Sequence, residues 1–171
     1  MKESILDVLG RGELVIGDGA IGTMLQAAGL PAGMLPEAWN LENPEAVKAV
    51  HRAYLEAGAQ FMTTNTFGGN RLRLKEAGLD DQIAEINGQG IGLAKEVAGD
   101  DAWVAASVGS TGQLLEPYGS LTMVEAEEVY AQQMVMLVGA GADFILVETQ
   151  HDIDEACCVV RMAKAHTVLP V

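Results

Sequence analysis

The sequence predicts an α/β fold with a parallel sheet, and three observations support this. Short apolar runs alternate with longer helical patterns, one segment of the chain is repeated, and polar residues stand where the predicted strands end. Strands that are joined through helices by short turns run parallel, because each helix returns the chain to the same end of the sheet. Periodicity alone does not distinguish a closed barrel from an open doubly wound sheet. The predicted strands are residues 14–16, 61–64, 103–107 and 144–147, and residues 169–171 begin a fifth.

The predicted helices begin at residues that cap helices, and their apolar residues fall on one face. Thr122 with Glu125 forms a capping box, and Asp152 with Glu155 begins the last helix in the same way. The predicted helices start at Asn43–Pro44 (ending at Gly58), within 70–97 (divided at Gly78), at Thr122 and at Asp152. Their predicted inward faces are Val47, Val50 and Tyr54; Ala126, Val129, Tyr130, Met134 and Leu137; and Ile153, Cys157 and Val160.

A short internal repeat indicates that two strand ends are equivalent. Residues 57–61 read Ala-Gly-Ala-Gln-Phe, and residues 140–144 read Ala-Gly-Ala-Asp-Phe. In each copy a helix ends at glycine, a strand follows, and a polar residue stands at the carboxyl end of the strand. The register is the same in both copies, so Asn65 and Glu148 are predicted to occupy equivalent places.

Composition and charge restrict the classes of function. The 171 residues are 49% hydrophobic and 20% charged, which is typical of a globular protein, and we interpret residues 1–171 as one domain. The net charge of −14 argues against nucleic acid or a membrane as partner, because both attract basic surfaces. Residues 1–13 lack the pattern of a signal peptide, and no apolar run approaches the roughly 20 residues of a membrane span. We therefore expect a cytoplasmic enzyme.

Polar residues at the predicted strand ends are the candidate site. In a parallel α/β fold the carboxyl ends of all strands meet at one rim, so these side chains are expected to converge. The two carboxylates among them could hold a ligand ammonium, or act as general acid and base. The same residues could instead cap helices or brace turns, and the pattern alone leaves both interpretations open. The candidates are Asp18, Thr64, Asn65, Ser107 and Glu148.

The glycine-rich stretch at residues 17–22 has two interpretations. It reads Gly-Asp-Gly-Ala-Ile-Gly and matches the spacing of a dinucleotide-binding loop after a strand. Asp18 would face the pyrophosphate unfavourably, and no second strand precedes the acidic residue about twenty positions further on. The pattern therefore favours a loop in which Gly17, Gly19 and Gly22 let a ligand approach the backbone closely.

The cysteines and histidines show no metal-ligand spacing. Cys157 and Cys158 are adjacent in a helical pattern, where neighbouring side chains point about 100° apart and do not chelate one metal in the usual way. We expect Cys157 to pack in the core and Cys158 to be packed or partly exposed. We expect His51 to be a surface or hydrogen-bonded residue, whereas His151 is a weak candidate for a place near the rim.

Together these motifs resemble the homocysteine S-methyltransferase family, in the right order and over essentially the whole chain. Pro36-Glu37 and Asn40-Leu41 are most similar to the homocysteine module of cobalamin-dependent methionine synthases and related corrinoid methyltransferases. One departure is Ser110, which stands where the family usually has proline. The matching stretches are residues 17–25, 40–59, 64–74, 106–112 and 148–156.

The resemblance implies a (βα)8 barrel of the TIM type, of which this chain would form the first four βα units and the start of strand five. A complete barrel typically needs about 250 residues. By the same resemblance, Asp18 and Glu148 would bind the amino group of homocysteine. Gly19 and Thr64 would contact its carboxylate end or line the pocket, and Asn65 would support the rim. The resemblance identifies no catalytic residue within the chain.

The chemistry that the resemblance implies is methyl transfer to the homocysteine thiol, forming methionine, with zinc favouring the thiolate. The family's zinc cysteines would lie beyond this chain, and we assign no metal ligand to Cys157 or Cys158. The methyl donor is left open among a methylcorrinoid, methylfolate through cobalamin, betaine and S-methylmethionine. A corrinoid-protein partner or self-association would fit. The alternative is a non-catalytic half-barrel that binds an amino acid or assembles with a partner.

Overall fold

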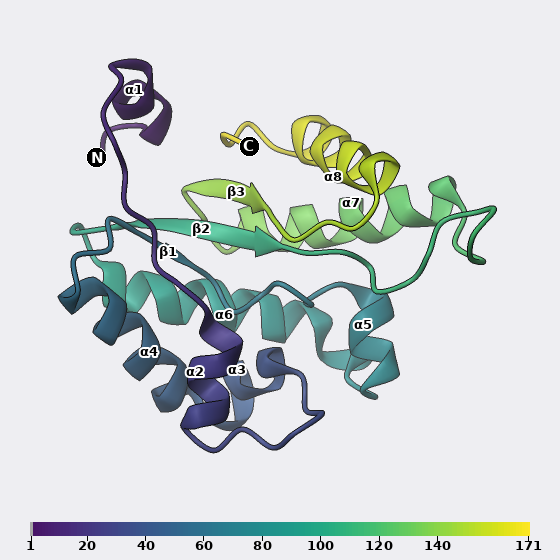
Figure 1. The fold of residues 1–171 in the computed structure, drawn as a ribbon, viewed down its shortest axis with the longest axis horizontal. Helices are drawn as coiled ribbons and strands as arrows, with labels where there is room; N and C mark the ends of the chain where they lie inside the picture. The colour runs from purple at the N-terminus through teal and green to yellow at the C-terminus, as the bar shows by residue number, and fades with distance from the viewer. Residues whose placement is uncertain (1) are drawn as a thin grey trace.

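The computed structural model describes residues 2–171 and contains one open sheet of three parallel strands. The strand order is β1-β2-β3, with bounds Phe61–Thr63, Trp103–Val108 and Phe144–Val147. Figure 1 shows α6 and α7 running along the sheet, while α2, α3 and α4 are gathered beside α6. The α-helices are α1 Ile5–Gly10, α2 Ile21–Ala27, α3 Trp39–Glu42, α4 Pro44–Glu56, α5 Arg71–Glu76, α6 Ile83–Ala98, α7 Met123–Gly139 and α8 Ile153–His166; the 3-10 helices are η1 Pro36–Ala38 and η2 Asp80–Gln82.

The two faces of the sheet contact different parts of the chain, because side chains alternate along each strand. One face carries Met62, Val104 and Ile145 against buried residues of α6, α7 and α8. The opposite face carries aromatic residues, among them Phe61 and Phe144, whose rings meet edge to face with centroids 5.4 Å apart. The predicted parallel sheet is therefore confirmed, with a helix after each strand on one face.

The predicted first and fifth strands are wrong. Residues 14–16 form no strand, and Gly17 makes only a single parallel bridge to Phe61. Leu14 is 92% exposed and Ile16 63% exposed, so this apolar run gains too little burial to extend the ladder. Residues 169–171 likewise form no strand, although Ile145 N donates to the carbonyl of Pro170 at 2.8 Å. Pro170 has no N–H with which to continue such a ladder.

The predicted start and the predicted buried face of α7 are both confirmed. The Thr122 hydroxyl accepts from Glu125 N at 3.2 Å, and the Glu125 carboxylate accepts from Thr122 N at 3.0 Å. All of the predicted inward residues of this helix are buried. Helix α4 also begins at Pro44 as predicted, although the Asn43 side chain makes no capping hydrogen bond.

Helix α8 is rotated relative to the prediction. Asp152 caps it by accepting from Asp154 N and Glu155 N, but the Glu155 side chain is buried and does not return to the cap. The inward residues are Glu155, Cys158, Val159 and Ala163, whereas Ile153 is 76% exposed and Cys157 is exposed. The expectation that Cys157 packs in the core was therefore wrong, whereas Cys158 is packed, which is one of the two outcomes expected for it. A register difference of one residue rotates a helix by about 100°, and the apolar pattern of this helix is too broad to fix that rotation.

His51 also differs from the expectation, because it is neither at the surface nor hydrogen-bonded. The side chain is fully buried on α4, and neither ring nitrogen has a hydrogen-bond partner within residues 2–171. Burial lowers the pKa of His51 to about 4, so the ring is neutral near pH 7.

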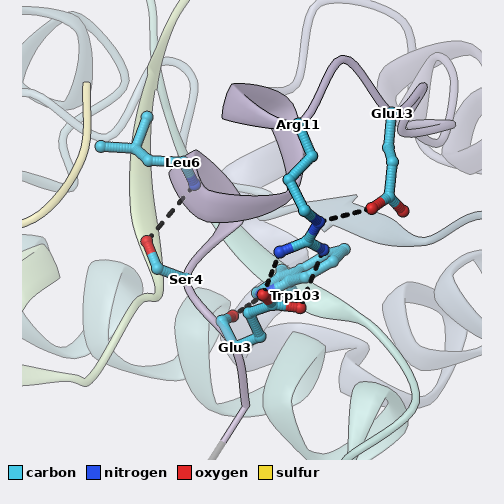
Figure 2. Close-up of polar contacts among 6 residues, drawn as sticks. All are labelled: Glu3, Ser4, Leu6, Arg11, Glu13 and Trp103. Carbon is cyan, nitrogen blue, oxygen red and sulfur yellow. Dashed lines mark hydrogen bonds and ion pairs between the residues drawn. The ribbon is translucent and has the colours of Figure 1, made fainter.

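Helix α1 lies at the amino-terminal end of the sheet, with Ile5 and Val8 buried and several polar contacts around it (Figure 2). Trp103 Nε1 donates to the carbonyl of Glu3 at 2.9 Å, and Arg11 pairs with both Glu3 and Glu13. These ion pairs are exposed and screened by solvent, so the burial of Ile5 against the sheet is the stronger attachment. Among the described residues, no helix is long and apolar enough to cross a membrane.

Candidate functional site

A cavity of about 800 Å³ lies at the carboxyl ends of the strands. Its wall combines the loop before α2, the turn at η1, the ends of the three strands and part of α5. The strands are parallel, so polar residues from distant parts of the sequence converge there, as the sequence predicted. The lining includes every candidate from the strand ends together with Gly19: Asp18, Gly19, Thr64, Asn65, Ser107 and Glu148.

Asp18 is held at the end of β1 by two hydrogen bonds from one residue. Thr63 N donates to Asp18 Oδ2 and Thr63 Oγ1 donates to Asp18 Oδ1, both at 2.9 Å. Burial raises the pKa of Asp18 to about 6; the Thr63 hydrogen bonds oppose this rise and the charge of Glu148 adds to it. Asp18 and Glu148 therefore act on each other across the cavity as like charges.

Glu148 follows β3 and is held by the neighbouring strand. Ser107 Oγ donates to Glu148 Oε1 at 2.6 Å, and Glu148 N donates to the carbonyl of Val108 at 3.1 Å. The next residue, Thr149, has a φ of 52°, in the left-handed region that non-glycine residues rarely adopt. Two fixed carboxylates with unused lone pairs suit a ligand that donates several hydrogen bonds, such as an ammonium group.

Thr64 and Asn65 mainly brace the rim of the cavity. The hydroxyls of Thr64 and Thr66 lie 2.6 Å apart, and Thr66 Oγ1 donates to the carbonyl of Ser107 at 2.8 Å. Asn65 Nδ2 donates to the carbonyl of Pro36 at 2.8 Å and to Asn40 Oδ1 at 2.9 Å. These bonds connect the end of β1 to β2 and to η1, so both residues fix the shape of the cavity.

Gly19 lines the cavity where no side chain fits. A Cβ at this position would lie 2.8 Å from the hydroxyl of Tyr54, which itself donates to the carbonyl of Ala20 at 3.0 Å. A side chain at residue 19 would therefore displace the Tyr54 ring from this loop. Gly17 bridges to Phe61 of β1, and β2 and β3 follow in order, so β1 and β2 separate β3 from the glycine-rich segment. A dinucleotide-binding sheet places the fourth strand beside the first, so the alternative interpretation of residues 17–22 is not supported.

The sequence interpretation missed two charged residues of the cavity, Glu37 and Arg73. Glu37 is only 2% exposed, and its Oε1 accepts from Gly68 N at 2.6 Å, while Oε2 has no hydrogen-bond partner among residues 2–171. Burial raises the pKa of Glu37, against the opposing effects of the Gly68 hydrogen bond and the charge of Arg73. Arg73 comes from α5, and its buried Nε has no partner within the described residues. Pro36-Glu37 contributed to the family resemblance without being assigned to the site, and Arg73 belongs to no motif that marks a site.

The described residues hold no group that could bind a metal ion. Within residues 2–171 there is no cluster of three or more His, Cys, Asp or Glu with that capacity. Cys157 and Cys158 lie on α8 and do not line the cavity. His151, the weak candidate for the rim, is exposed and also lies outside the cavity lining.

Comparison with known proteins identifies the family. The sequence profile of homocysteine S-methyltransferase matches residues 15–171. This chain belongs to the homocysteine S-methyltransferase family. It is 34% identical over 161 residues to methionine synthase from Mycobacterium tuberculosis, covering 87% of this chain and 13% of that protein. It is 35% identical over 173 residues to betaine–homocysteine S-methyltransferase 1 from Mus musculus, covering 96% of this chain and 41% of that protein.

The fold of this family member is also similar to a solved structure. The metallated form of the homocysteine methyltransferase MmuM from Escherichia coli superposes with a TM-score of 0.80 and 25% sequence identity. The match covers 94% of this chain and 62% of that protein. The chain therefore spans less than two thirds of each of these relatives.

Proposed function

We propose that this chain forms the amino-acid-binding part of a (βα)8 barrel that transfers a methyl group to the thiol of homocysteine, forming methionine. Family membership supports the reaction class, and the strand–helix alternation supports a barrel whose first βα units these residues provide. The observation that carries the proposal is the pair of carboxylates, Asp18 and Glu148, on one cavity at the carboxyl ends of the strands.

The ammonium group of homocysteine would bind between Asp18 and Glu148. Each contact is a charge-assisted hydrogen bond. Burial is the main cause of the raised pKa of Asp18 and the charge of Glu148 adds to it; the ligand's positive charge would relieve this repulsion between the two carboxylates. Gly19 and Thr64 would lie along the carboxylate end of the amino acid, and Asn65 would hold the rim in place. In this proposal the residues of this chain bind and orient the substrate, and none of them acts as acid, base or nucleophile.

Zinc, which the family resemblance leads us to expect, does not fit the residues described. The cavity lining includes no cysteine or histidine, and no other group within residues 2–171 could hold a metal ion. We therefore assign no metal ligand and derive no metal-dependent step here. The methyl donor, including a cobalamin carried by a corrinoid protein, is likewise not assigned by any residue of this cavity.

Homocysteine affinity, measured by calorimetry for the wild type and for Asp18→Asn and Glu148→Gln, tests the proposal. Each variant should bind homocysteine roughly tenfold to a hundredfold more weakly, because a hydrogen bond to a charged group contributes about 1.5–3 kcal/mol. The loss should be much smaller for 4-mercaptobutyrate, which is homocysteine without its amino group. Asp100→Asn, at an exposed carboxylate outside the cavity, is the matched control. Wild-type affinity in both cavity variants would show that the carboxylates are structural.

A further inference from the structure

The carboxylates of Asp18 and Glu148 are each held by a hydroxyl group of a neighbouring strand, but they are held unequally. Asp18 accepts from both the backbone N–H and the hydroxyl of Thr63. The Glu148 carboxylate accepts from Ser107 Oγ at 2.6 Å, and this is its only hydrogen bond to any of residues 2–171. The direction of the Glu148 side chain therefore depends on one serine, to which the proposed function assigns no role.

The backbone of Ser107 is fixed by two hydroxyl groups that follow β1. Ser107 N donates to Thr64 Oγ1 at 3.2 Å, and the carbonyl of Ser107 accepts from Thr66 Oγ1 at 2.8 Å. The Thr66 hydroxyl has a single proton, so Thr64 is the donor in the 2.6 Å contact between the two threonine hydroxyls. Both threonine protons are thus used inside this network, whereas the proton of the Ser107 hydroxyl is donated to Glu148.

Ser107 and Glu148 differ in how easily a ligand reaches them. Ser107 lies in β2, the middle strand of the sheet, opposite Leu146 of β3, and it is only 2% exposed. Glu148 is partly exposed on the cavity. Its Oε1 carries the hydrogen bond from Ser107, while Oε2 accepts none from residues 2–171 and remains accessible. A ligand therefore meets Glu148 more readily than the serine that holds it.

The carboxylates of Asp18 and Glu148 repel each other across the cavity. Burial is the main cause of the raised pKa of Asp18, and the charge of Glu148 adds to it. Because glutamate has a long and flexible side chain, an unrestrained Glu148 carboxylate would turn away from Asp18 toward solvent. A hydrogen bond that holds it in place before the ligand arrives removes this ordering cost from binding.

We propose that Ser107 is a positioning residue of the ammonium-binding site: its hydroxyl holds Glu148 beside Asp18, so that Oε2 is free to accept from the amino group of the amino-acid ligand. Ser107 contributes to affinity through Glu148 and not through a contact of its own with the ligand. The inference rests on the proposed function, because it names the residue that keeps the carboxylate pair together. It gives β2 a part in selecting ligands that carry an ammonium group.

Calorimetric titration of the 171-residue protein with homocysteine and with 4-mercaptobutyrate tests this role. Ser107→Ala should weaken homocysteine about five- to tenfold, because binding would then have to order the Glu148 side chain. For 4-mercaptobutyrate, which lacks the amino group, the change should be about twofold at most. Ser110→Ala is the matched control, since Ser110 is a buried serine in the loop after β2 that does not line the cavity, and it should leave both affinities unchanged.

The ratio of the two affinities separates positioning from a general loss of structure. A variant that is partly unfolded binds both ligands less, by the same factor, so the folded fraction cancels in the ratio. Ser107→Ala should therefore lower the preference for homocysteine over 4-mercaptobutyrate even if it also lowers the unfolding temperature. An unchanged ratio in this variant would overturn the inference.

A double-mutant cycle with Glu148→Ala separates positioning from direct contact. If Ser107 acts through Glu148, Ser107→Ala should cause no further loss of homocysteine affinity once the Glu148 side chain is absent. A loss of the same size with and without that side chain would show that Ser107 binds the ligand itself, and the inference would then be wrong.

Glu148→Ala alone distinguishes failure of this inference from failure of the proposed function. If Glu148→Ala loses homocysteine while Ser107→Ala keeps the wild-type ratio, the ammonium site stands and the role of Ser107 is rejected. If Glu148→Ala keeps the wild-type affinity for homocysteine, the carboxylate pair does not bind the amino group, and both proposals fail.

Discussion

Replacing Asp18 with asparagine should change how the stability of this protein depends on pH. In the folded protein the pKa of Asp18 is raised from 3.8 to about 6, chiefly by burial. Between these two values the folded state holds a proton that the unfolded state has lost, so raising the pH lowers the free energy of unfolding. This contribution is fully present below about pH 4 and is lost as the pH rises through about 6. Asparagine does not titrate, so the Asp18→Asn variant lacks this pH-dependent contribution to stability.

The expected magnitude follows from the size of the pKa change. The difference between 3.8 and about 6 corresponds to about 3 kcal/mol, at 1.36 kcal/mol for each pH unit. Because Asp18 is only partly buried, solvent screening reduces this to about 1–2 kcal/mol. Asparagine can keep both contacts with Thr63, because its oxygen can accept from Thr63 N while its NH₂ donates to Thr63 Oγ1, and these contacts do not change with pH. The stability of the variant relative to wild type should therefore rise by about 1–2 kcal/mol between pH 4 and pH 7.

Urea unfolding of both proteins at pH 4, 5, 6 and 7 measures this difference curve. Asp100→Asn is the matched control, because it removes one charge from an exposed turn of a protein whose net charge is −14. Its difference curve is subtracted to correct for the general effect of charge. Groups common to both proteins, such as buried His51, cancel in the comparison. A corrected curve that is flat, or that falls from pH 4 to pH 7, would refute the argument that burial holds a proton on Asp18.

Two further predictions concern stability. Glu155→Ala should lower the free energy of unfolding, measured in urea, by about 3 kcal/mol or more, because three buried donors would lose their acceptor. These donors to Glu155 Oε1 are Thr111 N, Thr111 Oγ1 and Tyr130 OH. Glu155→Gln keeps an acceptor and should lower the free energy of unfolding clearly less, so equal losses in the two variants would contradict the prediction. Thr122→Ala should cost about 1 kcal/mol by removing the cap of α7, whereas Thr122→Ser should restore most of it; no loss in the alanine variant would show that the capping box contributes little.

Local sequence patterns were sufficient to predict the helices and strands that are determined by interactions within a few residues of the chain. The capping box at Thr122 and the short apolar runs that form β2 and β3 depend on residues close together in the chain, so the sequence predicted them correctly. The prediction of a strand at residues 14–16 was wrong because a strand also needs a hydrogen-bonded partner strand and a covered face, and the exposed Leu14 has neither. The predicted inward face of α8 was wrong because the rotation of this helix depends on Glu155, whose hydrogen-bond partners Thr111 and Tyr130 are distant in the sequence.

The sequence by itself determined the family of this chain, the direction of its strands and the convergence of its strand-end residues on one cavity. Parallel strands leave no other arrangement, because every strand ends at the same edge of the sheet. Only the tertiary structure decided that Glu37 and Arg73 join this cavity, that His51 is buried with no hydrogen-bond partner among residues 2–171, and that Cys158 rather than Cys157 faces the core. The physical reason is that the rotation of a helix and the burial of a charged side chain depend on contacts between segments far apart in the chain.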